Sequence, residues 1–354
     1  MLIHTDCRYF RSTVPCKPHK QHGVHCDTCI YYDRVTVHIL IIKLGAIGDV
    51  IRTTPLLHRL KKEYPSAKIW WLTRTPEILP EQIDERLGFN LDNVLLLRST
   101  RFNFLFNLDK DREACALTME IQADTKMGFT LKDGMCTPIN AQAEEKFYTG
   151  LFDDLNKANK ESYLEEIFGM CGYTFDGEKY ILPISNWTDT RWKFAKGKKV
   201  VGLNTGCGDR WTSRLWPEQY WVKLASQLKK RGYEVVLLGG EQEHEKNQRL
   251  ARKSKVKYFG FYPLNGFINL IDRCDLVVTA VTMAMHITIG LNKKIILFNN
   301  IFNSHEFELY GLGVILEPDF NCTCYFSQTC ENNCMQYLKP GRVVRSIQAV
   351  LPIK

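Results

Sequence analysis

The sequence predicts an α/β protein of two domains, each built around a parallel β-sheet. At 354 residues the chain exceeds the size at which single hydrophobic cores stop growing. Short runs of consecutive apolar, often β-branched residues, such as 39–42 and 234–238, are typical of strands covered on both faces. Segments with helical spacing separate these runs, and this alternation is expected of parallel sheets.

The first alternation begins after a polar leader. We expect strands near 37–42, 68–72 and 94–97, with helical segments between them. Pro55 indicates that the main helix of the first crossover begins there and that the turn before it is irregular. Residues 141–168 are expected to be mostly helical.

The second alternation has the same character. Its expected elements are strand 199–203, helix 217–231 and strands 234–238, 276–279 and 294–298. Residues 183–196 are interpreted as the crossing between the domains. The predicted organisation is therefore a leader at 1–35, a domain at 36–185 and a domain at 186–354 that carries a Cys-rich loop at 320–335.

Composition limits the function classes. The chain has no run of about 18 apolar residues, so no membrane-spanning helix is expected. Residues 1–16 are polar and lack the apolar region of a secretory signal, which predicts a cytoplasmic location. The net charge of +8 suits anionic substrates or peripheral contact with the inner membrane, although a solvated basic surface gives the same value. Basic clusters are short and not interleaved with aromatics, so no nucleic-acid partner is predicted.

Thirteen cysteines require an explanation in a reducing compartment. Two sets are candidate metal ligands, namely Cys7, Cys16, Cys26 and Cys29 in the leader and Cys322, Cys324, Cys330 and Cys334 near the C-terminus. Cys26 and Cys29 have the two-residue spacing of a metal knuckle, whereas the Cys-x-Cys start of the second set is less usual for zinc. Four thiolates can hold a segment that has too few apolar residues for a core. Zinc or iron would serve, disulfides are the rival interpretation, and His19, His22 and His25 are substitute ligands. The other five cysteines are interpreted as small buried residues.

A strand followed by a glycine-containing turn delivers one carboxylate to a helix start. Residues 39–42 form the strand, Gly45 and Gly48 follow, and Asp49 comes next. Glycine permits close approach of a ligand, and ligands bind at the carboxyl ends of parallel strands. Asp49 is therefore a candidate general base. A helix cap is the alternative interpretation.

Three segments, in this order, resemble the motifs of glycosyltransferase family 9, the ADP-heptose heptosyltransferases. They are residues 43–55 followed by 56–57 and 64–69, residues 202–208 running to 214–217, and residues 279–286. The resemblance covers roughly residues 37–354 and implies a GT-B fold, with two Rossmann-like domains facing a cleft. It implies that the first domain binds the acceptor and the second binds the nucleotide sugar.

The resemblance implies two groups of site residues besides the catalytic Asp49. The donor group is Thr205, Gly206, Arg214, Glu243, Thr282, Met283, Ala284 and His286, and the acceptor-side loop contributes Lys43, Gly45, Gly48 and Arg52. Arg214 stands where the family usually has a phosphate-binding Lys. A surface role for Arg214, a helix-start role for Glu243 and a buried, hydrogen-bonded role for His286 are the alternatives.

One motif departs from the family. The common Asp-Thr-Gly-x-x-His reads Val281-Thr282-Met283-Ala284-Met285-His286 here, so the carboxylate and the glycine are both replaced. Thr282 is expected to cap the following helix, whose backbone amides would meet a diphosphate. His305 and Glu306 belong to a loop that in relatives approaches the donor.

The implied reaction is inverting transfer from an ADP-sugar. Asp49 would deprotonate an acceptor hydroxyl, while Arg214 and the amides near Thr205 and Thr282 stabilise the departing nucleotide diphosphate. No catalytic metal is expected.

The acceptor would be lipopolysaccharide core or another envelope glycan. The C-terminal Cys set resembles the iron-binding cluster of heptosyltransferases that modify proteins, which makes a protein acceptor the second hypothesis. A metal-stapled nucleotide- or glycan-binding protein without transfer activity is the third.

Overall fold

The computed structural model describes residues 2–183 and 192–353 and divides the chain into two compact units. The first contains residues 1–46, 53–147 and 167–178, and the second contains residues 47–52, 148–166 and 179–354. The expected crossing at 183–196 lies largely outside the described residues. None of the described helices is both long and apolar enough to cross a membrane.

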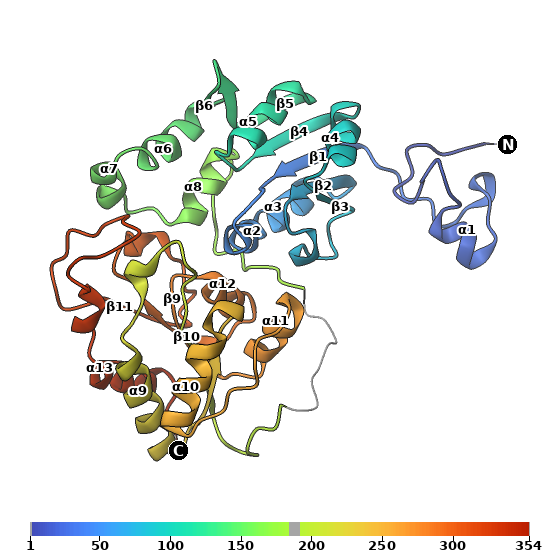
Figure 1. The fold of residues 1–354 in the computed structure, drawn as a ribbon. Coiled ribbons are helices and arrows are strands. Elements are labelled where there is room, and N and C mark those ends of the chain that lie inside the picture. Colours follow the sequence, from blue (N-terminus) through green and yellow to red (C-terminus); the bar gives the residue numbers. More distant parts are fainter. Residues whose placement is uncertain (1, 184–191, 354) are drawn as a thin grey trace. The chain divides into compact units, whose positions relative to one another are not determined.

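The first unit holds a six-stranded sheet (Figure 1). Its strands are β1 (Val37–Ile42), β2 (Ala67–Thr73), β3 (Glu85–Gly88), β4 (Arg101–Asn107), β5 (Gln122–Lys132) and β6 (Met135–Pro138). Their order is β3-β2-β1-β4-β5-β6, and all neighbours are parallel except β5 and β6. Residues 39–42 of β1 are fully buried, as the continuous apolar run predicts.

Helices connect these strands. They are α3 (Leu56–Glu63), α4 (Leu91–Arg98) and α5 (Arg112–Glu120). Helix α1 (Lys17–His22) lies in the leader. Three further helices contribute residues to both units, namely α2 (Ile47–Thr53), α6 (Ala141–Thr149) and α8 (Tyr163–Met170). The Arg8 side chain ties the leader to the first sheet, because it pairs with Asp84 at 2.7 Å and donates to the Ala67 carbonyl at 2.9 Å.

Two local predictions are wrong. Residues 94–97 lie in helix α4, not in a strand, because the Asn90 side chain accepts the Asn93 N–H and caps a helix that leaves Leu91 and Leu95 exposed. A short apolar run does not by itself distinguish the two structures. The segment before Pro55 is the regular helix α2, not an irregular turn.

The second unit holds a five-stranded parallel sheet in the order β11-β10-β9-β7-β8. The strands are β7 (Val200–Asn204), β8 (Glu234–Leu238), β9 (Leu276–Ala280), β10 (Lys294–Phe298) and β11 (Gly313–Leu316). The helices are α7 (Asp153–Ala158), α9 (Glu218–Lys230), α10 (His244–Ser254), α11 (Leu264–Asp272), α12 (Met283–Gly290) and α13 (Pro340–Val350). The expected strands and the helix at 217–231 are confirmed.

Strand β10 shows why this sheet is apolar throughout. Ile296 and Phe298 belong to a core cluster with residues of α9 and α13, which lie side by side in Figure 1. Ile295 and Leu297 belong to a different cluster with Met285 of α12. Alternate side chains point to opposite faces of a strand, so helices cover both faces of the sheet.

Gly128 provides a test of the first sheet. It pairs with Asn107 in the β4–β5 ladder with φ of +98°, and a Cβ atom there would lie 2.0 Å from the Asn107 carbonyl oxygen. We expect Gly128→Ala to lower the free energy of unfolding by about 3 kcal/mol or more, because strain and a backbone clash add. Gly177→Ala is the matched control, since Gly177 has φ of +78° with open space around it. Denaturant unfolding of both variants measures the difference, and equal losses would contradict the clash.

Candidate functional site

Asp49 lies in the first turn of α2 and pairs with Arg52 of the same helix at 2.8 Å. Arg52 also pairs with Glu306 at 3.1 Å, and its guanidinium carbon lies 3.3 Å from the centre of the Tyr163 ring. The Arg52 side chain is 13% exposed and that of Asp49 is 33% exposed. A buried cation therefore holds the candidate base, and Asp49 itself stays accessible.

The surroundings of Arg52 keep it charged. Burial acts to lower the pKa of the guanidinium, but the charges of Asp49, Tyr163 and Glu306 outweigh burial and raise it. A buried charge is tolerated when it is paired and hydrogen-bonded. Arg52 thus presents a permanent positive charge to both carboxylates.

His286 of α12 packs directly against the Gly48 backbone. A Cβ atom on residue 48 would lie 2.5 Å from the imidazole Cδ2 atom, so only glycine fits there without displacement. The His286 Nδ1 atom lies 3.5 Å from the Tyr180 hydroxyl. Burial and the charge of Arg52 lower the pKa of His286 to about 3. His286 is therefore a buried, neutral residue, and its ring packs against Gly48, the residue before Asp49.

Lys43 and Gly45 lie in the first unit, at the end of β1. The Lys43 ammonium lies 3.4 Å from the Asp109 carboxylate, and both side chains are buried. The second Asp109 oxygen accepts the Leu44 N–H at 2.8 Å. The Cβ position of Gly45 faces open space, so a ligand has room to approach the backbone here.

The turn after β7 is held by side chains from neighbouring strands. The Asn204 amide donates to the Gly206 carbonyl at 3.3 Å and to the Thr279 hydroxyl at 3.0 Å. The Thr205 hydroxyl donates to Asn247 at 2.5 Å, and the Lys246 ammonium donates to the Thr205 carbonyl at 3.0 Å. These contacts bring a cation and a rigid turn to the carboxyl edge of the second sheet.

Glu243 lies against the same turn. Its carboxylate accepts the Gly240 N–H at 2.9 Å, as expected of a helix-start Glu. A Cβ atom on Gly206 would overlap the Glu243 carboxylate. Gly206 is therefore needed for the close approach of the two segments, whatever ligand Glu243 contacts.

Arg214 is buried and bonds to backbone carbonyls. Its guanidinium donates to the carbonyls of Val281, Cys207 and Trp211, the last two at 2.9 and 3.4 Å. Burial lowers the pKa of Arg214, although an arginine remains charged at neutral pH. Arg214 thus links the turn after β7 to the turn after β9 and is not a surface residue.

Thr282 occupies the N-cap position of α12, but its side chain makes no capping hydrogen bond. The hydroxyl lies instead 3.0 Å from the Thr279 hydroxyl and accepts from Asn204 at 3.4 Å. The expected capping bond is therefore replaced by a link to β7 and β9. The next residues, Met283 and Ala284, form the first turn of α12, where N–H groups favour anions.

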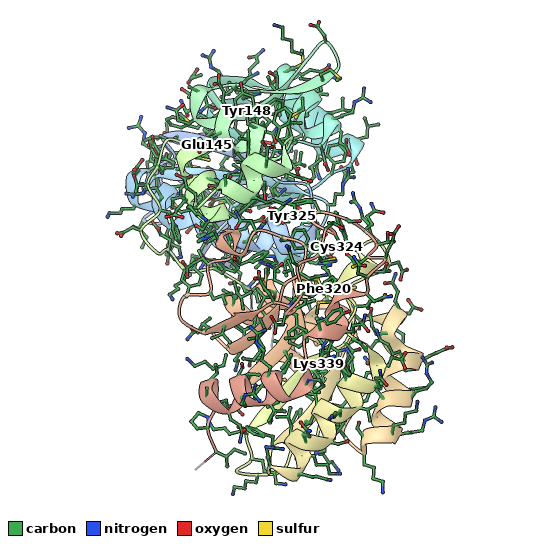
Figure 2. The ribbon with its side chains drawn as sticks, turned by 90° about the vertical axis from the view of Figure 1, so that its left-hand side faces the viewer. Glu145, Tyr148, Phe320, Cys324, Tyr325 and Lys339 are labelled. Carbon is green, nitrogen blue, oxygen red and sulfur yellow. The ribbon has the colours of Figure 1, made fainter. Side chains whose placement is uncertain are left out.

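The second cysteine set comes together. The Sγ atoms of Cys322, Cys324, Cys330 and Cys334 lie within 4.8 Å of one another, on the loop where Figure 2 labels Cys324 and Tyr325. Burial raises the pKa of the Cys322 thiol, but hydrogen bonds with Cys324, Cys330 and Asn332 outweigh burial and lower it to about 7. Four converging sulfurs, one of them readily ionised, fit a tetrahedral zinc or iron ion.

The leader cysteines are placed differently. Among residues 2–183 and 192–353, the four C-terminal thiols are the one gathered set of metal-ligand type. Cys7, Cys16, Cys26 and Cys29 are partly exposed free thiols, so their metal site stays a prediction. In the structure Cys115, Cys171 and Cys274 are buried, while Cys136 and Cys207 are half-buried.

Several residues of the site escaped sequence reasoning. No motif marks Tyr163, Asp109 or Lys246 in a single sequence. Asn204 and Thr279 lie inside two of the family motifs and near the ends of buried strands, but neither is among the predicted site residues. Tyr163 stands in a helical segment 111 positions after Arg52 in the numbering, and only the fold brings the two together.

Comparison with known proteins adds a family match. Residues 167–334 match the model of Glycosyltransferase family 9 (heptosyltransferase). The chain is 25% identical over 296 residues to the lipooligosaccharide heptosyltransferase 2 of Haemophilus influenzae, with 73% of this chain and 82% of that protein covered. It is 27% identical over 290 residues to the lipopolysaccharide heptosyltransferase 2 of Escherichia coli K12, with 73% and 81% covered.

Solved structures of similar fold agree. The family 9 glycosyl transferase of Veillonella parvula matches with a TM-score of 0.65 at 17% identity, over 90% of this chain and 97% of that one. The E. coli ADP-heptose lps heptosyltransferase II matches with a TM-score of 0.65 at 18% identity, over 89% and 98%. The iron-containing dodecameric glycosyltransferase TibC matches with a TM-score of 0.54 at 12% identity, over 89% and 76%. These likenesses confirm the predicted GT-B fold class.

The burial of His286 predicts a pH dependence of stability. Because its pKa falls from 6.5 to about 3 on folding, the unfolded chain binds more protons between these values, and the free energy of unfolding decreases as pH falls through this range. We expect His286→Gln to remove about 2 kcal/mol of the wild-type loss between pH 7 and pH 5. Urea unfolding at both pH values measures this change, and an unchanged difference would show that His286 titrates normally.

Proposed function

We propose that this chain, a glycosyltransferase whose residues 167–334 match the family 9 (heptosyltransferase) model, moves a heptose-like sugar from an ADP-sugar. The acceptor would be a hydroxyl of lipopolysaccharide core or another envelope glycan. The family match over the donor-side residues carries this proposal. The H. influenzae and E. coli relatives, both named for lipopolysaccharide or lipooligosaccharide heptosyl transfer, support the sugar and acceptor classes.

Asp49 would act as the general base. It removes the proton of the acceptor hydroxyl while that oxygen attacks the anomeric carbon from the face opposite the leaving diphosphate, which inverts the configuration. Its partial exposure gives an acceptor access to the carboxylate. Arg52 holds the Asp49 carboxylate in place, and Glu306 pairs with the same guanidinium.

The donor site would bind the diphosphate with a fixed frame. Arg214 uses three of its five N–H groups on carbonyls, and the remaining ones are available in principle to phosphate oxygens. Lys246 adds a second positive charge beside the Thr205 carbonyl. Together with the first N–H groups of α12, these groups would stabilise the negative charge that develops on the leaving nucleotide diphosphate.

The four C-terminal thiols support a structural metal at Cys322, Cys324, Cys330 and Cys334. A zinc or iron ion held by these four thiolates would stabilise the loop 322–334. The iron-containing neighbour TibC gives iron some preference. The second candidate function is transfer to a protein hydroxyl, because the four cysteines resemble the iron-binding cluster of heptosyltransferases that modify proteins. A glycolipid acceptor would place the enzyme on the cytoplasmic face of the inner membrane.

The roles of Asp49 and Arg214 separate in a binding and turnover experiment. We expect Asp49→Asn to lower turnover by about 10²–10⁴-fold at saturating substrates, because a positioned base is lost, with ADP affinity nearly unchanged. Arg214→Lys keeps the charge but loses the bonds to the carbonyls, and we expect weaker ADP binding. Calorimetry with ADP, UDP and GDP and a sugar-transfer assay measure both.

The outcomes distinguish the candidate functions. Near-normal turnover of Asp49→Asn would remove the assigned base. Absence of nucleotide binding by metal-replete protein would favour the non-enzyme hypothesis. A requirement for an intact polypeptide acceptor would favour protein modification.

Metal content tests the cysteine clusters. We expect the double variant Cys324→Ser/Cys334→Ser to lose one metal ion per chain, because these two thiols are the buried members of the set. Loss of the metal should also lower the unfolding temperature, since metal binding stabilises the folded chain. The matched variant Cys26→Ser/Cys29→Ser tests the leader set. Elemental analysis of purified protein gives the metal and its ratio. If Cys324→Ser/Cys334→Ser retained all of its metal, the assignment of these cysteines as metal ligands would be overturned.

A further inference from the structure

The cysteine loop packs against the turn that carries Arg214. Short helix η3 (Thr212–Arg214) is hydrogen-bonded to residues 327 and 328 of the loop. The Ser213 N–H donates to the Gln328 carbonyl at 2.9 Å, and the Ser213 hydroxyl donates to the Ser327 carbonyl at 2.7 Å. Two hydrogen bonds from one buried serine thus fix the turn to the loop.

Asn300 forms a second, more direct connection. Its side-chain amide donates to the Ser213 carbonyl at 2.9 Å and also to the Cys334 sulfur at 3.3 Å. An amide has two N–H groups, so both bonds can exist at once. One side chain therefore touches both a candidate metal ligand and the backbone of the Arg214 turn.

The two sites also share an apolar core. Cys324, Cys334 and Ile301 are buried together, and Trp211 and Phe302 pack against them. The Arg214 guanidinium carbon lies 5.7 Å from the centre of the Phe302 ring. A change in the position of the thiols is consequently transmitted to the residues that support Arg214, because packed cores do not deform smoothly.

We propose that Asn300 is a positioning residue that couples metal binding at the four thiols to nucleotide binding at Arg214. A metal held by the four thiols would fix the position of the Cys334 sulfur, and the Asn300 amide, which donates to this sulfur, would be fixed with it. The other N–H group then holds the Ser213 carbonyl, which keeps η3 and Arg214 in the geometry that binds phosphate.

The coupling must be reciprocal. If the metal raises ADP affinity by a given factor, ADP raises metal affinity by the same factor, and couplings of this kind are typically about 5–150-fold. The ADP half of this inference rests on the proposed function. The ordering of residues 211–215 by the metal does not, because it follows from contacts within the protein.

The test compares Asn300→Ala with Asn332→Ala. Asn332 also donates an amide N–H to a thiol of the set, Cys322 at 3.8 Å, but among the described residues it makes no hydrogen bond to η3. Both variants thus remove one N–H···S bond, and Asn300→Ala also removes the link to Ser213. Asn300→Leu, which has a similar volume but no N–H groups to donate to the Ser213 carbonyl or to Cys334, serves if Asn300→Ala does not fold.

Three quantities are measured on the full chain, as purified and after metal removal: metal per chain, hydrogen exchange of the 211–215 amides, and ADP affinity by calorimetry. We expect Asn300→Ala to retain its metal while exchange at 211–215 becomes at least about fivefold faster and ADP affinity falls by a similar factor. Asn332→Ala should behave as wild type.

Equal behaviour of Asn300→Ala and wild type in exchange would overturn the coupling. If the wild-type protein binds no ADP, the proposed function fails, while the exchange data still decide whether Asn300 and the metal order the turn. Faster exchange in both Asn300→Ala and Asn332→Ala would assign the effect to the loss of a bond to sulfur and would reject the specific role of Asn300.

Discussion

The parallel register of β7, β8 and β9 is the constraint on which the predicted donor-binding residues of the second unit depend. Asn204 pairs with Leu238 of β8, and Leu203 pairs with Val278 of β9, so the three strands end at the same level. The turns that follow them must then meet at one edge. Asn204 fills this meeting point, where it bonds to both Thr279 and Thr282. The positions of the turns after β7 and β9, which carry Thr205, Gly206 and Thr282, follow from this alignment.

Buried cations stabilise the turns that the strands bring together. Arg214 satisfies carbonyls of two turns, Arg52 pairs with two carboxylates, and Lys43 pairs with Asp109. Each cation is costly to remove from water unless its partners are complete. Such pairs fix geometry more than they add stability. The proposed site, with a diphosphate to bind and a base to orient, requires fixed geometry.

The cysteine loop adds a small core where the polypeptide offers few apolar side chains. Its buried members are Ile301, Cys324 and Cys334, with aromatic rings around them. On one side the loop contacts the Arg214 turn. On another, Tyr325 bonds to Asn156 of α7, and the Lys157 ammonium lies over the Tyr325 ring. A metal at the thiols would therefore stabilise a junction between separate segments of the second unit.

The sequence by itself determined the α/β class, most strands, the helix after Trp216-Pro217 and the three family motifs, because buried strands and glycine turns leave local patterns. It also identified four cysteines whose sulfur atoms converge. The helix at 91–98 was missed, because a short leucine run fits either structure. Only the tertiary structure decided that Glu306 shares Arg52 with Asp49 across 254 positions, and that Asn300 joins a thiol to the Arg214 turn, since such contacts depend on how the chain packs and leave no periodic signal.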